Sequence, residues 1–262
     1  DHFRERFLAK QEQREFLSLA AARANRLETN WNSYLPPVPV NSGIHQLIDF
    51  PLSELREYID WTPFFSAWEL RAKYPRIFEH DKYGDEARKL FADAECMLDD
   101  WIATGTLRAN GVFGLFPANS VDSDDIDIYA DESRDEVSYK VVGLRQQTLH
   151  LGDRKNLSLA DFIAPHDSGV NDYIGAFAVT AGIGLEQLVA DYEAVHDVYN
   201  SMLAKALADR LAEAFTEYLH HQIRTEKWGY ASNESLDQAE IIKEQYRGIR
   251  PAPGYPANPD HQ

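Results

Sequence analysis

Cysteine is almost absent from this sequence, and its scarcity excludes whole classes of protein. The 262 residues include one cysteine, Cys96, so the chain can form no internal disulfide and no cysteine cluster around a metal. Because Cys96 falls within an amphipathic helical pattern, we expect it to be a buried structural thiol. The sequence has no amino-terminal signal peptide and no apolar run of membrane-spanning length. We therefore expect a cytoplasmic protein.

Basic residues are also few. Lys and Arg together number 26 against 43 for Asp and Glu, which gives a formal net charge of −17 at pH 7. A surface of this sign repels phosphate backbones and argues against a nucleic-acid ligand, although a need for solubility would explain it equally well. Hydrophobic residues make up 44% of the chain and aromatic residues 12%, which is enough for a substantial core.

The common cofactor and hydrolase motifs are missing as well. The sequence contains no GxGxxG, P-loop, HExxH or GxSxG pattern, so neither a common nucleotide fold nor a hydrolytic triad is indicated. Glu217 and His221 lie four residues apart, as metal ligands often do, but no third ligand is nearby and we predict no metal site. A group of aspartates lacks the spacing, Gly and Glu of a calcium loop, and we interpret it as a solvated turn. Its members are Asp122, Asp124, Asp125 and Asp127.

Hydrophobic periodicity predicts an α+β fold, with an antiparallel sheet flanked by helices. Helical spacing predicts helices over residues 52–59, 85–104 and 236–246, and one long helix, with room for a bend, over 184–228. Alternating or apolar runs separated by short turns predict five strands in antiparallel hairpins. These strands are expected at residues 43–50, 111–117, 126–129, 137–144 and 173–179.

The last sixteen residues read RGIRPAPGYPANPDHQ and contain four prolines. Each proline fixes its own φ near −65° and biases the preceding residue toward extended geometry. We therefore predict a stiff, extended strip whose backbone groups find no partners within it. Arg250 offers a planar fork suited to a carboxylate, Tyr255 offers an aromatic face, and Gly254 lets a ligand approach closely. A proline-rich linker is the plain alternative.

The run RPAPGYPA followed by PDH resembles the signature of the activation domain of cobalamin-dependent methionine synthase. The resemblance extends from about residue 22 to residue 261, and seven further blocks agree with the family in the same order. These blocks are YIDWTPFF (58–65), KYPRI (73–77), GLFPAN (114–119), LRQQ (144–147), LADFIAP (159–165), DYIGAFAVTAG (172–182) and KALADRLAEAFTEYLH (205–220).

The resemblance implies a curved, C-shaped domain whose C-terminal strip wraps S-adenosylmethionine. It places acidic side chains near the positive groups of the ligand, an arginine at its carboxylate, and the strip backbone against its adenine or amino-acid end. The residues it implies are Asp60, Glu213, Glu244, Arg250, Ala252, Gly254 and Tyr255. Each acidic residue keeps a plain alternative: a helix cap for Asp60, a salt bridge with Arg210 or an exposed position for Glu213, and a surface carboxylate for Glu244.

In this family the domain rescues enzyme whose cobalamin has been oxidised to cob(II)alamin. The resemblance implies that a reduced flavoprotein such as flavodoxin supplies an electron, and that S-adenosylmethionine then methylates the reduced cobalamin on a neighbouring domain. No acid–base catalytic residue is implied, because the domain positions a methyl donor. Two other functions remain open: a docking module for flavodoxin and the cobalamin domain, and a hydrolase that uses Asp60 and Glu213 as a carboxylate pair.

The chain departs from the family pattern in its last residues. The family continues beyond the PDH run with further ligand contacts, and Asn258 stands where a Cys is common. We therefore expect a linker helix at residues 1–30 and a C-terminally incomplete activation domain at residues 31–262.

Overall fold

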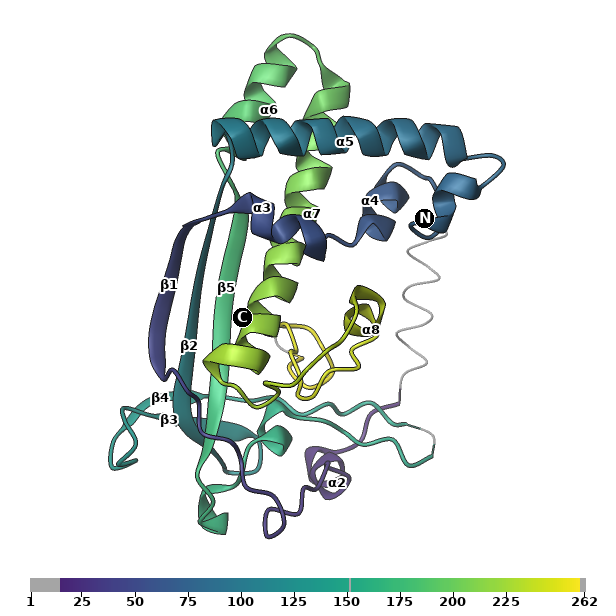
Figure 1. Ribbon diagram of the computed structural model, residues 1–262. Coiled ribbons are helices and arrows are strands. Elements are labelled where there is room, and N and C mark those ends of the chain that lie inside the picture. The colour runs from purple at the N-terminus through teal and green to yellow at the C-terminus, as the bar shows by residue number, and fades with distance from the viewer. Residues whose placement is uncertain (1–14, 151, 260–262) are drawn as a thin grey trace.

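The protein is an antiparallel sheet with helices at one face and one end, and the predicted α+β class is confirmed (Figure 1). The computed structural model describes residues 15–150 and 152–259. The strands are β1 (Gly43–Phe50), β2 (Arg108–Val121), β3 (Asp125–Tyr129), β4 (Val137–Val141) and β5 (Asp172–Ile183). All five match the predicted strands, with β2 and β5 several residues longer.

Strand β2 is the centre of the sheet. Its first half pairs with β1 along one edge, its last four residues pair with β3 along that edge, and β5 pairs with it along the other. Strand β4 then pairs with β3. The register puts Phe113 of β2 opposite His45 of β1 and Phe177 of β5. Most successive residues in the second half of β2 are buried, which explains why this half alternates only weakly in hydrophobicity.

The helices are α2 (Leu19–Ala24), α3 (Leu52–Leu55), α4 (Trp61–Ala67), α5 (Gly84–Thr104), α6 (Leu185–Ala194), α7 (Val198–Gln222) and α8 (Gln238–Ile242). Helix α5 matches its predicted bounds and ends at Gly105, whose φ of 68° lets the chain leave the helix. A π-helical turn, Ile223–Lys227, extends α7. Residues 1–14, half of the predicted linker helix, lie outside the described residues.

The structure confirms one long helix, α7 with its π-helical turn, but the predicted bounds of 184–228 are wrong because residues 185–194 form a separate helix. The chain breaks at His196, where φ is 60°, and Asp197 caps the next helix by accepting a hydrogen bond from the Asn200 backbone N–H at 3.0 Å. Helices α6 and α7 therefore fold back on each other as a hairpin (Figure 1). A helical hydrophobic period continues across such a break, so periodicity alone did not reveal it.

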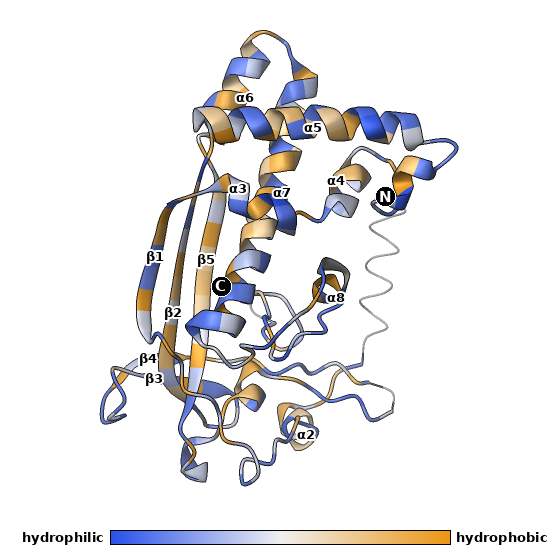
Figure 2. Cartoon of the chain, in the orientation of Figure 1, coloured by the Kyte–Doolittle hydropathy of each residue, from blue (hydrophilic) through white to orange (hydrophobic). Residues whose placement is uncertain are grey.

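The main core lies between the sheet and α7 and continues under α5. Figure 2 shows hydrophobic colouring along β2 and β5 beside α7, and alternating hydrophobic and hydrophilic turns in α5. Leu207, Leu211 and Phe215 of α7 are fully buried in it. Phe215 packs so closely on β2 that a Cβ at Gly111 would lie 3.0 Å from its ring. These contacts fix the position of α7, the helix that carries Glu213 and Glu217.

The molecule has a C-shaped outline. Figure 1 shows α4 and α5 extending from one end of the sheet, and α2 with residues 142–150 and 152–170 extending from the other. Helix α8 and the C-terminal segment lie between these two arms. Within the described residues, no helix is both long enough and apolar enough to cross a membrane.

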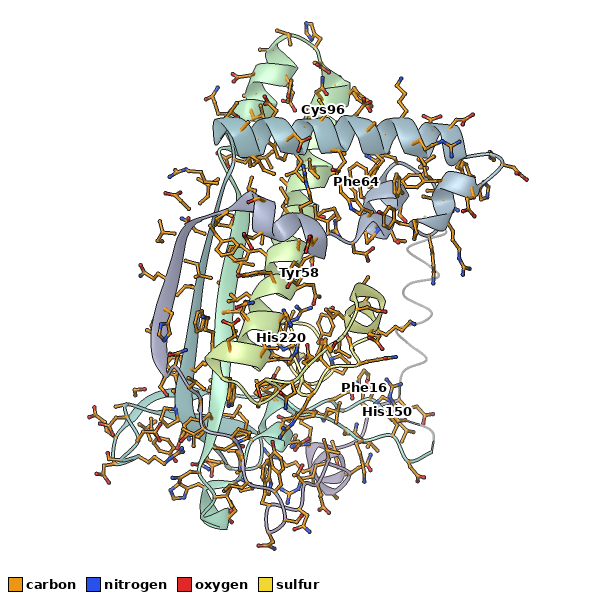
Figure 3. The ribbon with its side chains drawn as sticks, in the orientation of Figure 1. Phe16, Tyr58, Phe64, Cys96, His150 and His220 are labelled. Carbon is orange, nitrogen blue, oxygen red and sulfur yellow. The ribbon has the colours of Figure 1, made fainter. Side chains whose placement is uncertain are left out.

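Cys96 is exposed, and its predicted burial is wrong (Figure 3). It lies on α5, whose inward face is formed by Leu90, Ala94 and Leu98. Because Cys96 falls between two of these positions in the helical period, its side chain points to solvent.

The aspartate group at residues 122–127 is only partly a solvated turn. Asp124 is buried and accepts hydrogen bonds from Nε of Arg145 and Nε of Arg23, both at 2.6 Å. Arg145 is itself fully buried and also donates to Asp161 at 2.7 Å. The interpretation of Asp124 as solvated is therefore wrong.

Candidate ligand site

The C-terminal strip, which we define as residues 250–259, folds into a compact turn. The Gly254 backbone N–H donates to the Asn258 carbonyl at 2.8 Å, Tyr255 N–H to the Ala252 carbonyl at 3.1 Å, and Asn258 N–H to the Tyr255 carbonyl at 2.9 Å. The prediction of an extended strip without internal backbone partners is therefore wrong. The prolines leave the residues between them free to turn, and Gly254 reverses the chain with φ of 92°.

The three strip residues implied in ligand binding besides Arg250 all face solvent. Ala252 and Gly254 are exposed, and the Tyr255 side chain is 55% exposed. The Ala252 carbonyl is used within the turn, so its N–H is the group left for a ligand. An exposed aromatic face and free backbone groups suit contact with a nucleoside.

Arg250 ties the strip to α7. Its Nη2 lies 2.5 Å from Oε1 of Glu217, and the two side chains are 21% and 24% exposed. Arg250 Nη1 and Glu217 Oε2 are shielded from solvent and have no hydrogen-bond partner within the described residues. The guanidinium therefore keeps a second donor group that a carboxylate could accept.

A fully buried arginine fixes the segment that leads to the strip. Arg224 donates from Nη2 and Nε to the Glu234 carboxylate, at 2.5 Å and 2.9 Å. Its Nη1 donates to Nδ1 of His220 at 2.8 Å, and its guanidinium lies 4.4 Å from the centroid of the Tyr246 ring. His220 is buried at the end of α7, on the side of the C-terminal segment (Figure 3). No pattern in the sequence predicted this network.

The buried His220 is neutral. Burial, aided by the positive charges of Arg224 and Arg250, lowers its pKa to about 2. A neutral imidazole is required here because Nδ1 must accept the hydrogen bond from Arg224. Its protonation would put two positive charges in contact inside the protein.

The phenol of Tyr246 is influenced by four charged side chains, those of Arg250, Glu244, Glu217 and Arg224. Burial raises the pKa of its phenol; Arg250 acts in the opposite direction, and Glu244 and Glu217 raise it further. Because these charges act on one phenol, Glu244 lies in the same neighbourhood as the Arg250–Glu217 pair. Glu244 itself is exposed and follows α8 with φ of 55°.

Glu213 lies one turn before Glu217, on the same side of α7. It is exposed and forms no ion pair within the described residues, because Arg210 pairs with the adjacent Asp209. Of the two plain alternatives, the exposed position is confirmed and the salt bridge with Arg210 is wrong. The carboxylate is therefore available to a ligand.

Asp60 caps α4. Its Oδ1 accepts a hydrogen bond from the Thr62 backbone N–H at 2.9 Å, which confirms the role as helix cap. The residue is half-buried, and α4 packs against α7. In Figure 1, α4 and α8 lie on the same side of α7. Within the described residues, no hydrogen bond or ion pair joins Asp60 to the strip.

Comparison with known proteins decides the family. Residues 51–262 match the family described as vitamin B12 dependent methionine synthase, activation domain. The chain belongs to this family. It is also similar to a solved structure described as the MetH reactivation domain bound to AdoHcy, with 53% identity and a TM-score of 0.89 over 94% of this chain and 75% of that one. The sequence resemblance is confirmed, and the protein is an activation domain of cobalamin-dependent methionine synthase.

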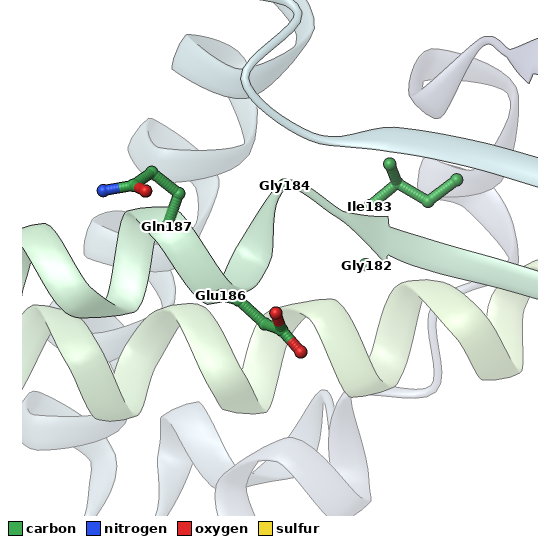
Figure 4. A pocket seen from close by; sticks show the side chains of 5 residues that line it. All are labelled: Gly182, Ile183, Gly184, Glu186 and Gln187. Atoms are coloured by element: carbon green, nitrogen blue, oxygen red, sulfur yellow. The ribbon is translucent and has the colours of Figure 1, made fainter.

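Two cavities of this activation domain lie away from the predicted ligand residues. One, of about 530 Å³, lies at the junction of β5 and α6 and is lined by Gly182, Ile183, Gly184, Glu186 and Gln187 (Figure 4). Another, of about 620 Å³, lies between residues 26–31 and the loops at 120–123 and 160–167. None of the seven predicted residues lines either cavity. The predicted site is instead a surface along α7, α8 and the strip.

The described part of the activation domain also contains no group of three or more His, Cys, Asp and Glu residues that could hold a metal ion. His221 meets the Tyr58 hydroxyl through Nδ1 at 3.1 Å, while Glu217 meets Arg250. The i, i+4 pair in the sequence therefore has two separate partners.

Proposed function

We propose that this activation domain binds S-adenosylmethionine along α7 and presents its methyl group to cobalamin on a neighbouring domain of the same enzyme. The observation that carries the proposal is Arg250, which is held against α7 with one guanidinium nitrogen that has no partner among the described residues. Arg250 opens the RPAPGYPA run, the segment by which the sequence resembles the family. The related MetH reactivation domain was solved with AdoHcy, the product that S-adenosylmethionine becomes when it loses its methyl group.

The charges of the site match those of the ligand. S-adenosylmethionine carries a sulfonium, an ammonium, a carboxylate and an adenine, and the chain offers a counterpart to each. Arg250 would take the carboxylate, and the exposed carboxylates of Glu213 and Glu244, with half-buried Asp60, would surround the positive groups. Ala252 and Gly254 would approach the ligand through their backbone, and Tyr255 would stack or make a cation–π contact, which is worth about 1 kcal/mol.

The chain's contribution to the reaction is positioning. The bound sulfonium supplies the methyl group, and transfer of a methyl group from sulfur to a strong nucleophile moves no proton. A general acid or base is therefore unnecessary, and the residues of the site need only hold the sulfur–methyl bond in line with the acceptor. The anionic groups along α7 stabilise the positive charge until the methyl group leaves.

The partners follow from the same proposal. Vitamin B12 in the family description supports a cobalamin-binding domain of the same enzyme as one partner. A reduced flavoprotein such as flavodoxin is proposed as the electron donor on the family resemblance alone.

We also propose residues 31–262 as the domain and residues 1–30 as a linker. The family match begins at residue 51.

Calorimetric titration with AdoHcy tests the proposal. We expect Arg250→Ala to weaken binding at least tenfold, since a charge-assisted hydrogen bond contributes about 1.5–3 kcal/mol. Arg247→Ala is the matched control, because Arg247 is an exposed arginine that contacts Tyr230 and Tyr34 and should bind within twofold of wild type. Equal affinities for both variants would exclude the role of Arg250. Wild-type chain that binds no AdoHcy yet captures the cobalamin domain would support the docking module instead.

A further inference from the structure

We propose that Glu217 is a further ligand residue, which recognises the α-ammonium group of the ligand while Arg250 recognises the α-carboxylate. The inference rests on the proposed function and adds to it the substrate class: adenosine compounds that carry an intact amino-acid end. Glu217 lies on α7, one turn after Glu213 and directly under the strip's first residue.

The Arg250–Glu217 pair is only half formed. A guanidinium and a carboxylate commonly meet through two parallel hydrogen bonds, but here a single contact of 2.5 Å joins Nη2 to Oε1. Nη1 and Oε2 are buried, and neither has a partner within the described residues. Buried polar atoms without partners are uncommon in folded proteins, and each requires an explanation.

An unpaired donor beside an unpaired acceptor is complementary to an α-amino acid. The amino acid carries a carboxylate and an ammonium on the same carbon, so one small group can accept from Nη1 and donate to Oε2. A nucleoside without this end would satisfy neither atom. The pair therefore selects for both charges of the ligand together.

The neighbours of Glu217 leave its second oxygen to the ligand. Arg250 is its one cationic partner within the described residues. His221, the next residue on the same face of α7, is engaged by the Tyr58 hydroxyl, and the imidazole of His220 accepts from Arg224. In the described part of the chain, no ammonium or guanidinium group of the protein pairs with Oε2 of Glu217.

Access to the two atoms requires the strip to shift. Residues 252–256 are exposed, and within the described residues no hydrogen bond ties residues 251–259 to the rest of the molecule. Within the described residues, the Arg250–Glu217 contact is thus the hydrogen bond that joins the strip to the rest of the molecule, and Ala257 is the strip residue that is buried. A ligand that gives partners to both buried atoms favours the arrangement in which they are reached.

Three ligands separate the possible roles of Glu217. AdoHcy carries both the ammonium and the carboxylate, decarboxylated S-adenosylmethionine keeps the ammonium alone, and 5′-methylthioadenosine has neither. The variant is Glu217→Gln, and Glu226→Gln, an exposed glutamate in the π-helical turn after α7, is the matched control. Binding is measured by calorimetry on the whole chain.

We expect Glu217→Gln to weaken AdoHcy and decarboxylated S-adenosylmethionine at least tenfold and to leave 5′-methylthioadenosine within twofold. Three outcomes would overturn the inference: wild-type affinities for all three ligands, loss that spares the decarboxylated ligand, or equal loss of all three. The second would mean that Glu217 acts only through Arg250, and the third that it is structural. Wild-type chain that binds none of the ligands would refute the proposed function as well.

Discussion

At the scale of single residues, we expect Arg224 to stabilise the C-terminal segment through its buried ion pair with Glu234. Its side chain is fully buried and that of its partner Glu234 is 6% exposed. Replacing one member of a buried pair leaves the other charge uncompensated, so we expect Arg224→Met to lower the free energy of unfolding by about 3–5 kcal/mol. Urea unfolding followed by circular dichroism measures this change.

An exposed pair provides the control for that prediction. Arg108 and Asp49 are joined at 3.2 Å, with side chains 58% and 56% exposed, and we expect Arg108→Met to cost less than about 1 kcal/mol. The double variant Arg224→Met, Glu234→Gln should recover part of the lost stability. If Arg224→Met costs no more than Arg108→Met, the network does not hold the segment.

His220 should make the stability of the protein depend on pH. Its pKa is about 2 in the folded protein and about 6.5 when unfolded. Above pH 6.5, His220 is neutral in both the folded and the unfolded protein, and its protonation does not reduce the free energy of unfolding. Below pH 6.5, the unfolded chain binds a proton that the native state does not, so stability falls as the pH falls. The loss from this group between pH 7 and pH 5 is about 2 kcal/mol.

The measurement is urea unfolding at pH 7 and pH 5. In His220→Asn, the amide oxygen can still accept from Arg224 and the residue no longer titrates, so this variant should lose about 2 kcal/mol less than wild type between the two pH values. His166→Asn changes an exposed histidine and should keep the wild-type difference. Identical pH dependence in all three proteins would contradict the assignment of a neutral buried His220.

The sequence allowed a residue's role to be predicted where that role depends on residues nearby in the chain. The cap at Asp60 follows from its neighbours in sequence, because its partner is the Thr62 backbone N–H. Arg224 and Glu217 were missed because their partners, Glu234 and Arg250, lie ten and 33 residues away. A single helical sequence does not distinguish a charged residue that meets such a partner from one that faces water. Arg224 follows the buried Ile223, and this position at the edge of the apolar stripe was the available signal.

At the scale of elements, the start of α4 combines a structural and a ligand role that substitution can separate. Asn caps helices about as well as Asp, so we expect Asp60→Asn to keep stability within a few tenths of a kcal/mol, whereas Asp60→Ala should cost about 1 kcal/mol. If the charge also meets the ligand, Asp60→Asn should weaken S-adenosylmethionine binding severalfold. Urea unfolding and calorimetry test both statements. A variant that binds like wild type would leave Asp60 as a cap only.

The packing of α7 on the sheet depends on the absence of a side chain at Gly111. A Cβ there would lie 3.0 Å from Phe215 and 3.3 Å from Val179, so we expect Gly111→Ala to lower the free energy of unfolding by roughly 1–3 kcal/mol. Gly182→Ala, where the nearest atom would be 4.0 Å away, is the control and should change stability by less than about 0.5 kcal/mol. Equal unfolding midpoints for the two variants would contradict the close packing.

Elements were predicted well wherever hydrophobic period and turn residues agree. The five strands and α5 are examples. The break between α6 and α7 was missed because His196 adopts a positive φ without glycine. The turn in the strip was missed because prolines restrict single residues, while the hydrogen bonds among Ala252, Gly254, Tyr255 and Asn258 reverse the chain.

At the scale of the whole molecule, α4 and α8 lie on the same side of α7 in the view of Figure 1. The residues proposed for the site come from the cap of α4, from α7, from the segment after α8 and from the strip, and Asp60 lies 153 residues before Glu213 in the sequence. Spacing alone could not have joined them, and the family resemblance supplied the set. The structure adds the contact between Arg250 and Glu217, and the two cavities described above lie elsewhere.

The most direct test of the central claim is a crystal structure of this chain with AdoHcy. The account predicts that the ligand lies along α7 between Asp60 and the strip, with its carboxylate within hydrogen-bond distance of the Arg250 guanidinium. Density for AdoHcy in the cavity beside residues 26–31, or anywhere out of reach of Arg250, would contradict it.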